Sequence, residues 1–137
     1  MKKIVVVSGY FDPLHIGHIE YINKAKKLGD RLIVILNNDN QAKLKKGKCF
    51  MLENDRKIIL ENLKSVDSVF LSIDNDDSVS KSLKLINPDI FAKGGDRYMK
   101  EIPERFVCDE NNIKIIDGLG SKIRNSKDFT GLKKEVI

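Results

Sequence analysis

The sequence has few cysteines and no long apolar run, and each shortage excludes a class of protein. Cys49 and Cys108 are the only cysteines and stand far apart, so free thiols are expected and no disulfide framework is implied. The longest apolar run is far too short to span a bilayer. The segment Met1–Val7 is basic and then apolar, but it has no long apolar core and no small-residue cleavage site. We therefore expect a cytoplasmic chain with no membrane partner, which begins with a strand.

Histidine is equally scarce, because His15 and His18 are the only two in the chain. Two histidines alone supply too few ligands for a zinc site. The net charge of +5 leaves three interpretations open: nucleic-acid binding, ordinary solvation of helix faces, or neutralisation of a polyphosphate. Basic residues are spread along the chain apart from one cluster, Lys43–Lys48, and this spread gives little support to a nucleic-acid partner.

Apolar segments of two periodicities alternate along the 137 residues, which suit a single domain over residues 1–137. Strands are predicted at Lys3–Val7, Leu32–Leu36, Ser68–Ser72, Asp89–Ala92 and Ile113–Ile116, and helices at Ile19–Leu28, Asn54–Leu63, Ser78–Ile86 and Ser126–Val136. Gly29 is expected to end the first helix as a C-cap glycine, and Asp74–Asp77 to cap the third. Lys43–Leu52 is interpreted as a loop. The pattern predicts an α/β, Rossmann-like doubly wound sheet of about five parallel strands.

In such sheets ligands bind at the carboxyl ends of the strands. Four segments are expected to converge there: Ser8–Asp12, Asn37–Asp39, Ser72–Asp74 and Lys93–Asp96. The first of them leads into a helix, and a helix N-terminus offers free N–H groups to an anion. Three-residue spacing places His15 and His18 on one face of that first turn, where two imidazoles and the amides would cradle a triphosphate. Two solvated histidines on a surface turn are the alternative.

The segment Gly9-Tyr10-Phe11-Asp12-Pro13-Leu14-His15-Ile16-Gly17-His18 resembles the HxGH motif of the cytidylyltransferase-like nucleotidyltransferases. Phe11-Asp12 before the histidines and Ala25–Asp30 after them make the match specific. The chain is similar, over roughly residues 3 to 128, to short members such as glycerol-3-phosphate cytidylyltransferase and heptose-1-phosphate adenylyltransferase domains.

This resemblance implies a reaction and a set of catalytic residues. A phosphate oxygen of the acceptor attacks the α-phosphorus of a nucleoside triphosphate, and pyrophosphate leaves without a covalent enzyme intermediate. His15 and His18 would contact the triphosphate, and either Lys45 or Lys46 would reach the α-phosphate and the acceptor. Arg56 would contact the acceptor phosphate. Without the resemblance, these last segments are equally compatible with a solvated basic loop and a capped helix start.

The resemblance also implies a nucleotide-binding set. Its members are Gly9, Tyr10, Phe11, Asp12, Gly17, Lys93, Gly94, Gly95, Asp96 and Ser121. Mg²⁺ would be held mainly by the triphosphate, with Asp12 close by. The chain departs from the family at Leu119–Ile123, which is one residue short of the usual Ser/Thr-rich stretch and retains a single hydroxyl at Ser121.

The nucleotide and the acceptor stay open at this point. Lys93-Gly94-Gly95-Asp96 favours ATP, whereas overall size favours CTP, which we prefer narrowly. The acceptor would be a phosphorylated sugar, polyol or small alcohol, and family resemblance suggests a homodimer. Two other functions remain: a nucleotide-binding regulatory module without turnover, and a nucleic-acid-binding or tRNA-synthetase-like protein. The chain is short for the latter and lacks an aromatic-rich basic face.

Overall fold

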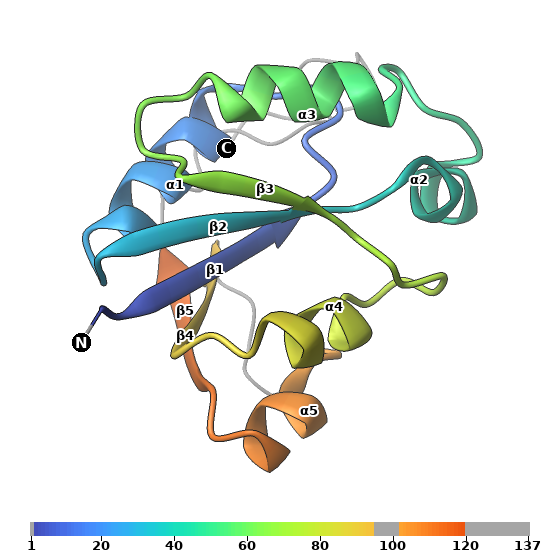
Figure 1. Cartoon of the computed structure of the whole chain (residues 1–137). Helices are drawn as coiled ribbons and strands as arrows, with labels where there is room; N and C mark the ends of the chain where they lie inside the picture. Colours follow the sequence, from blue (N-terminus) through green and yellow to red (C-terminus); the bar gives the residue numbers. More distant parts are fainter. Residues whose placement is uncertain (1, 95–101, 120–137) are drawn as a thin grey trace.

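A single parallel sheet organises the structure, a computed structural model that describes residues 2–94 and 102–119 (Figure 1). Its five strands lie in the order β3-β2-β1-β4-β5, and each neighbouring pair is parallel. They are β1 (Ile4–Gly9), β2 (Arg31–Leu36), β3 (Ser68–Leu71), β4 (Ile90–Gly94) and β5 (Lys114–Leu119). The predicted doubly wound α/β fold is confirmed. The predicted helix at Ser126–Val136 lies outside the described residues.

Helices cover both faces of the sheet. The helices are α1 (Ile16–Lys26), α2 (Asp39–Lys46), α3 (Glu53–Glu61), α4 (Ser80–Ile86) and α5 (Arg105–Glu110). Figure 1 shows α1 and α3 on one side of the sheet and α4 and α5 on the other. Side chains alternate along β1 accordingly, since Val5 and Val7 join the core under α1 and α3 while Val6 joins the core under α4 and α5. In the described part of the chain, no helix has the length and apolar character needed to cross a bilayer.

Helix α2 occupies part of the segment predicted as a loop. Asn38 caps it through a reciprocal pair of hydrogen bonds: the Asn38 side chain accepts from Gln41 N, and the Gln41 side chain accepts from Asn38 N. Leu44, the one large apolar side chain within α2, is 68% exposed, so the helix has no apolar stripe that periodicity could detect. The prediction of a loop over Lys43–Leu52 was therefore wrong for its first four residues.

Gly29 has a steric role and does not act as a left-handed C-cap. The C-cap residue that follows α1 is Lys27, whose backbone is right-handed. A Cβ placed on Gly29 would lie 2.7 Å from the carbonyl oxygen of Lys3 and 2.7 Å from Val5 Cγ2. Glycine is thus required because the chain after α1 passes close to β1, which corrects the sequence interpretation. The predicted cap of α4 is confirmed, since the Asp74 carboxylate accepts from the N–H groups of Lys81 and Ser82.

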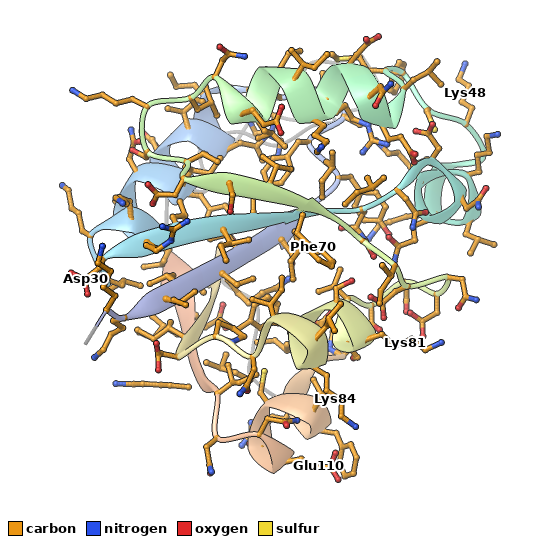
Figure 2. All side chains as sticks on the ribbon, in the orientation of Figure 1. Asp30, Lys48, Phe70, Lys81, Lys84 and Glu110 are labelled. Carbon is orange, nitrogen blue, oxygen red and sulfur yellow. The ribbon has the colours of Figure 1, made fainter. Side chains whose placement is uncertain are left out.

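Three aspartates tie the amino ends of the strands together. Asp30 accepts from Lys3 N at 2.7 Å, Asp89 from Ile4 N at 2.8 Å, and Asp67 from Leu32 N at 2.7 Å. Asp67 also pairs with Lys26 of α1 at 2.7 Å. Asp30 is labelled in Figure 2, at the end of the molecule opposite Lys48. The amino edge of the sheet is therefore closed by side chains, and the carboxyl edge is left for binding.

Replacing Asp67 with alanine is expected to lower the free energy of unfolding by about 1 kcal/mol, because a partly exposed ion pair and one backbone hydrogen bond are lost. The bond from Lys26, followed by that from Leu32 N, lowers the pKa of Asp67 below its usual range. A lowered folded pKa stabilises the fold above the usual carboxyl pKa, and this contribution is lost as the pH falls. Urea denaturation at neutral and acidic pH should show a difference between wild type and Asp67→Ala that shrinks in acid; a constant difference would contradict the assignment.

The strand order sets the place of the site. Chain connections run from β1 outward to β2 and β3, then return across β1 to β4 and β5. The order reverses between β1 and β4, and in open α/β sheets ligands bind in the crevice at that reversal. The turn from β1 into α1 lies directly beside it.

Candidate active site

The β1–α1 turn is shaped by an aromatic ring folded back under the strand end. Phe11 is 2% exposed and has a left-handed backbone, with φ of 49°. A Cβ on Gly9 would lie 2.9 Å from Cζ of this ring, so only glycine leaves room for it. The rings of Phe11 and His18 form a T-shaped contact with a centroid distance of 4.9 Å. Gly9 thus leaves space for the Phe11 ring, and Phe11 in turn packs against His18.

His15 and His18 cap helix α1 reciprocally. Nδ1 of His15 accepts from Gly17 N, and Nδ1 of His18 accepts from His15 N, each at 3.1 Å. The two rings stack at a centroid distance of 3.9 Å. An accepting Nδ1 carries no proton, so each neutral imidazole holds its proton on Nε2. The turn therefore presents two N–H donors of fixed tautomer at a helix N-terminus, which suits a phosphate oxygen.

The environment keeps His18 neutral. Burial, and after it the nearby His15 and the positive charge of Lys46, together lower the pKa of His18 from 6.5 to about 3. Protonating His18 on Nδ1 would also break its bond with His15 N. At neutral pH this histidine can donate a hydrogen bond but supplies no positive charge, so charge must come from lysine.

Lys46 and Asp12 form a tether between α2 and the β1–α1 turn. Lys46 Nζ donates to the Asp12 carbonyl oxygen at 2.6 Å and lies 3.4 Å from Asp12 Oδ2. The Asp12 carboxylate, 1% exposed as a residue, also accepts from Phe50 N at 2.9 Å and Met51 N at 2.8 Å. Its oxygens are committed to protein donors. We therefore assign Asp12 a positioning role, and its expected place close to a nucleotide-bound Mg²⁺ stays a prediction.

The two candidate lysines occupy different places. Lys45 Nζ lies over the ring of Tyr10 at 5.4 Å from its centroid, whereas Lys46 is tied to Asp12. Within residues 2–94 and 102–119, Lys45 forms no ion pair. The structure thus brings both lysines to the turn and leaves the charge of Lys45 the more available to a substrate.

Arg56 is buried, with 1% of the residue exposed. Its Nε donates to the Met51 carbonyl at 2.9 Å, its Nη1 to the carbonyls of Tyr10 and Asn37, each at 2.8 Å, and its Nη2 to Asp39 Oδ1 at 2.8 Å. A guanidinium committed in this way holds three backbone segments of the site together. The predicted contact with an acceptor phosphate finds no exposed donor here, and we assign Arg56 a positioning role.

Asp39 and Glu53 were missed as site residues. Asp39 N donates to Glu53 Oε1 at 2.7 Å, and Glu53 N donates to Asp39 Oδ1 at 2.8 Å, so the starts of α2 and α3 are clipped together. The thiol of Cys49 reaches Asp39 Oδ1 at 3.5 Å, and burial and this bond raise the pKa of Cys49. The only sequence signal was the position of Asp39 after a strand, where polar residues were expected to converge.

The remaining predicted residues divide into two groups. Lys93 and Gly94 end β4, where Lys93 Nζ lies 5.3 Å from the centroid of the Phe91 ring. A Cβ on Gly94 would lie 3.2 Å from Tyr21 Cδ1 and 3.3 Å from the Leu119 carbonyl, so the strand passes closely between them. Gly95, Asp96 and Ser121 lie outside the described residues. In the described residues no group of three or more His, Cys, Asp or Glu side chains could hold a metal ion.

A five-stranded parallel sheet with helices on both faces defines a Rossmann-like α/β domain. The chain belongs to the cytidylyltransferase-like family, whose model matches residues 6–119. It is 39% identical over 120 residues to the bifunctional protein HldE of Aliarcobacter butzleri, covering 85% of this chain and 25% of that protein. To HldE of Helicobacter hepaticus it is 44% identical over 118 residues, covering 85% of this chain and 24% of that protein. The chain thus spans about a quarter of the length of these curated relatives.

A solved structure shares the fold over most of the chain. It is the crystal structure of the lipopolysaccharide core biosynthesis protein from Thermoplasma volcanium, with a TM-score of 0.76 and 29% sequence identity. The superposition covers 89% of this chain and 100% of that one. The family membership expected from Gly9–His18 is therefore confirmed.

Proposed function

We propose that this chain transfers a nucleotidyl group from a nucleoside triphosphate to the phosphate of a small phosphorylated acceptor. A bond forms between an acceptor phosphate oxygen and the α-phosphorus, the bond from that phosphorus to the bridging oxygen breaks, and pyrophosphate leaves with its electron pair. The single observation that carries this proposal is the reciprocal cap of His15 and His18, which fixes Nε2–H as the donor of both rings at a helix N-terminus.

The proposed chemistry needs positioning and charge neutralisation more than a base, because the acceptor phosphate is already a nucleophile. His15 and His18 would donate to triphosphate oxygens and stabilise the negative charge on the departing pyrophosphate. Lys45 would contribute the mobile positive charge, with Lys46 held at the edge of the site by Asp12. Mg²⁺ would enter as part of the nucleotide substrate, coordinated by phosphate oxygens.

For the substrates we propose ATP and a phosphorylated sugar. Lys93-Gly94-Gly95-Asp96 resembles the corresponding segment of heptose-phosphate adenylyltransferases, and the solved relative is described as a protein of lipopolysaccharide core biosynthesis. The narrow preference for CTP rested on chain size alone and gains no support from the relatives. A homodimer stays a prediction from family resemblance.

Pyrophosphate release tests the proposal directly. The chain is incubated with ATP or CTP, Mg²⁺ and a panel of sugar 1-phosphates, glycerol 3-phosphate and ethanolamine phosphate. Release that requires both a nucleotide and one acceptor supports nucleotidyl transfer, and the preferred pair identifies the substrates. Saturable nucleotide binding without release across the whole panel would favour a regulatory module instead. Tight, salt-sensitive RNA binding without release would overturn the enzyme assignment.

A further inference from the structure

Two buried polar atoms beside the site have no hydrogen-bond partner among the described residues: the Tyr10 hydroxyl and Glu104 Oε1. Nearly all buried polar atoms in native proteins are paired, so such exceptions indicate a strained, catalytic or ligand-binding position. These two belong to segments far apart in the sequence, the turn after β1 and the residue before α5. Contacts through α2 link them: Lys45 of α2 lies over the Tyr10 ring, Gln41 of the same helix donates to the Ser78 carbonyl, and the next residue, Val79, donates its N–H to Glu104.

Glu104 is held by one of its two oxygens. The residue is 3% exposed, and Oε2 accepts from Val79 N, just before α4, at 2.8 Å. The carboxylate is thus fixed against the segment between β3 and α4, and its second oxygen is left as an acceptor. A fixed acceptor of this kind pairs best with an incoming O–H or N–H donor.

Tyr10 lies between charges of opposite sign. Lys45 Nζ is over the ring at 5.4 Å from its centroid, and the Tyr10 carbonyl accepts from the buried Arg56. At the hydroxyl end, burial raises the pKa of Tyr10, and the negative charges of Asp77, Glu104 and Asp76 raise it further. The residue is half-buried, so its ring offers a surface along which a ligand could lie.

The charges around Tyr10 indicate which chemical groups a matching ligand would carry. A phosphate would bind near Lys45, whereas a second anionic group would be repelled by the carboxylates at the hydroxyl end. A neutral hydroxyl can donate to Glu104 Oε1 and accept from Tyr10 at the same time, which would satisfy both unpaired atoms. We propose that Tyr10 and Glu104 form an acceptor-recognition pair that hydrogen-bonds a hydroxyl group of the phosphorylated acceptor. The inference rests on the proposed function and adds its specificity residues.

The position of Glu104 relative to the strands favours contact with the acceptor over contact with the nucleotide. Glu104 is bound to the segment between β3 and α4, and the expected nucleotide residues Lys93 and Gly94 end β4. The β3–α4 segment is also rigidly held, since Gln41 Nε2 donates to the carbonyls of Asp76 at 2.7 Å and Ser78 at 2.8 Å. A rigid wall around two unpaired groups can select among acceptors by their hydroxyl pattern.

Tyr10→Phe is the main test. It is expected to raise the KM for the preferred acceptor about 5- to 10-fold, the effect of one lost hydrogen bond. The KM for the nucleotide should stay within about twofold. Because the hydroxyl has no hydrogen-bond partner in the described part of the chain, its removal should leave Tm unchanged or higher. Tyr21→Phe is the matched control: its hydroxyl donates to the Ala92 carbonyl at 2.5 Å, so Tm should fall while the acceptor KM stays constant.

Acceptor analogues sharpen the test. A deoxy acceptor lacking the recognised hydroxyl should lose binding to the wild type by at least this factor, and Tyr10→Phe should distinguish the two acceptors less than the wild type does, because only the bond to Glu104 remains. Glu104→Gln keeps an oxygen for Val79 N and should weaken the hydroxylated acceptor. A lower Tm in Tyr10→Phe with an unchanged acceptor KM would overturn the inference and indicate a purely structural hydroxyl. A preference for ethanolamine phosphate over every polyol phosphate would overturn the hydroxyl assignment.

Direct binding separates this inference from the proposed function. Calorimetry with the acceptor panel is run on wild type and Tyr10→Phe beside the pyrophosphate assay. Tyr10-dependent binding of a sugar phosphate without any pyrophosphate release would support the recognition pair and overturn nucleotidyl transfer. Pyrophosphate release together with acceptor binding that does not depend on Tyr10 would support nucleotidyl transfer and overturn the recognition pair. Neither release nor binding across the panel would overturn both.

Discussion

Replacing His18 with alanine is expected to lower kcat for pyrophosphate release by about a hundredfold or more, the usual effect of removing one preorganised donor from a transition state. The Nε2–H of His18 is one of the two donors that the β1–α1 turn presents, and its ring stacks on His15 at 3.9 Å. Alanine therefore removes a hydrogen-bond donor and also removes the ring that stacks on His15. Steady-state kinetics with the preferred nucleotide and acceptor measure the loss.

A control must separate catalysis from helix capping, because alanine also removes the acceptor for His15 N and should destabilise α1 by about 1 kcal/mol. His18→Gln keeps a side-chain oxygen at this capping position, as glutamine does at the third position of other helices. Its Tm should stay near that of the wild type while kcat remains strongly reduced. If His18→Gln and the wild type turned over equally, the imidazole would have a capping role only.

The low pKa of His18 gives the same site a pH signature. Its folded pKa of about 3 lies below the unfolded value of 6.5, so the unfolded chain binds the proton first. The fold is therefore destabilised as the pH falls below about 6.5, and His18→Gln should remove that part of the dependence. Turnover should show no limb from His18 titration between about pH 5 and pH 8.

The sequence was sufficient for the sheet and for the histidine turn because both depend on local information. β1 and β2 are continuous apolar runs, and Gly9–His18 lies in one stretch whose spacing fixes the helix start. Helix α2 escaped prediction because a polar cap, not an apolar stripe, defines it. Periodicity detects burial along an element, and it does not detect a helix whose exposed face includes its leucine.

The roles of Asp12 and the lysines depended on contacts across the chain. The carboxylate of Asp12 is occupied by Phe50 N and Met51 N, which lie 38 and 39 residues away. Lys45 and Lys46 are adjacent in sequence, yet one lies over Tyr10 and the other binds Asp12. Nothing in the residue types fixes these partners, so composition and spacing could place the residues at the site without assigning their roles.

Arg56→Met is expected to lower the free energy of unfolding by about 3–5 kcal/mol, the usual loss when one partner of a buried ion pair is removed. The side chain of Arg56 is 0% exposed, and it serves the carbonyls of Tyr10, Asn37 and Met51 as well as Asp39. Methionine approximates its volume but leaves all four acceptors without this donor. Guanidinium denaturation followed by circular dichroism measures the loss as a shift in midpoint.

The matched control is Arg105→Met, whose side chain is 47% exposed in a pair with Asp109 at 3.6 Å. A surface pair of this kind contributes at most about 0.5 kcal/mol, so the midpoint should barely move.

The competing prediction from family resemblance is that Arg56 binds the acceptor phosphate. If Arg56→Met kept its stability within about 1 kcal/mol and instead raised the acceptor KM, the guanidinium would have to leave its carbonyl partners during the reaction, and the phosphate contact would be its main role. Loss of stability together with equal loss of binding for both substrates fits the positioning role, because the three backbone segments that Arg56 joins include Tyr10 after β1 and Asn37 after β2.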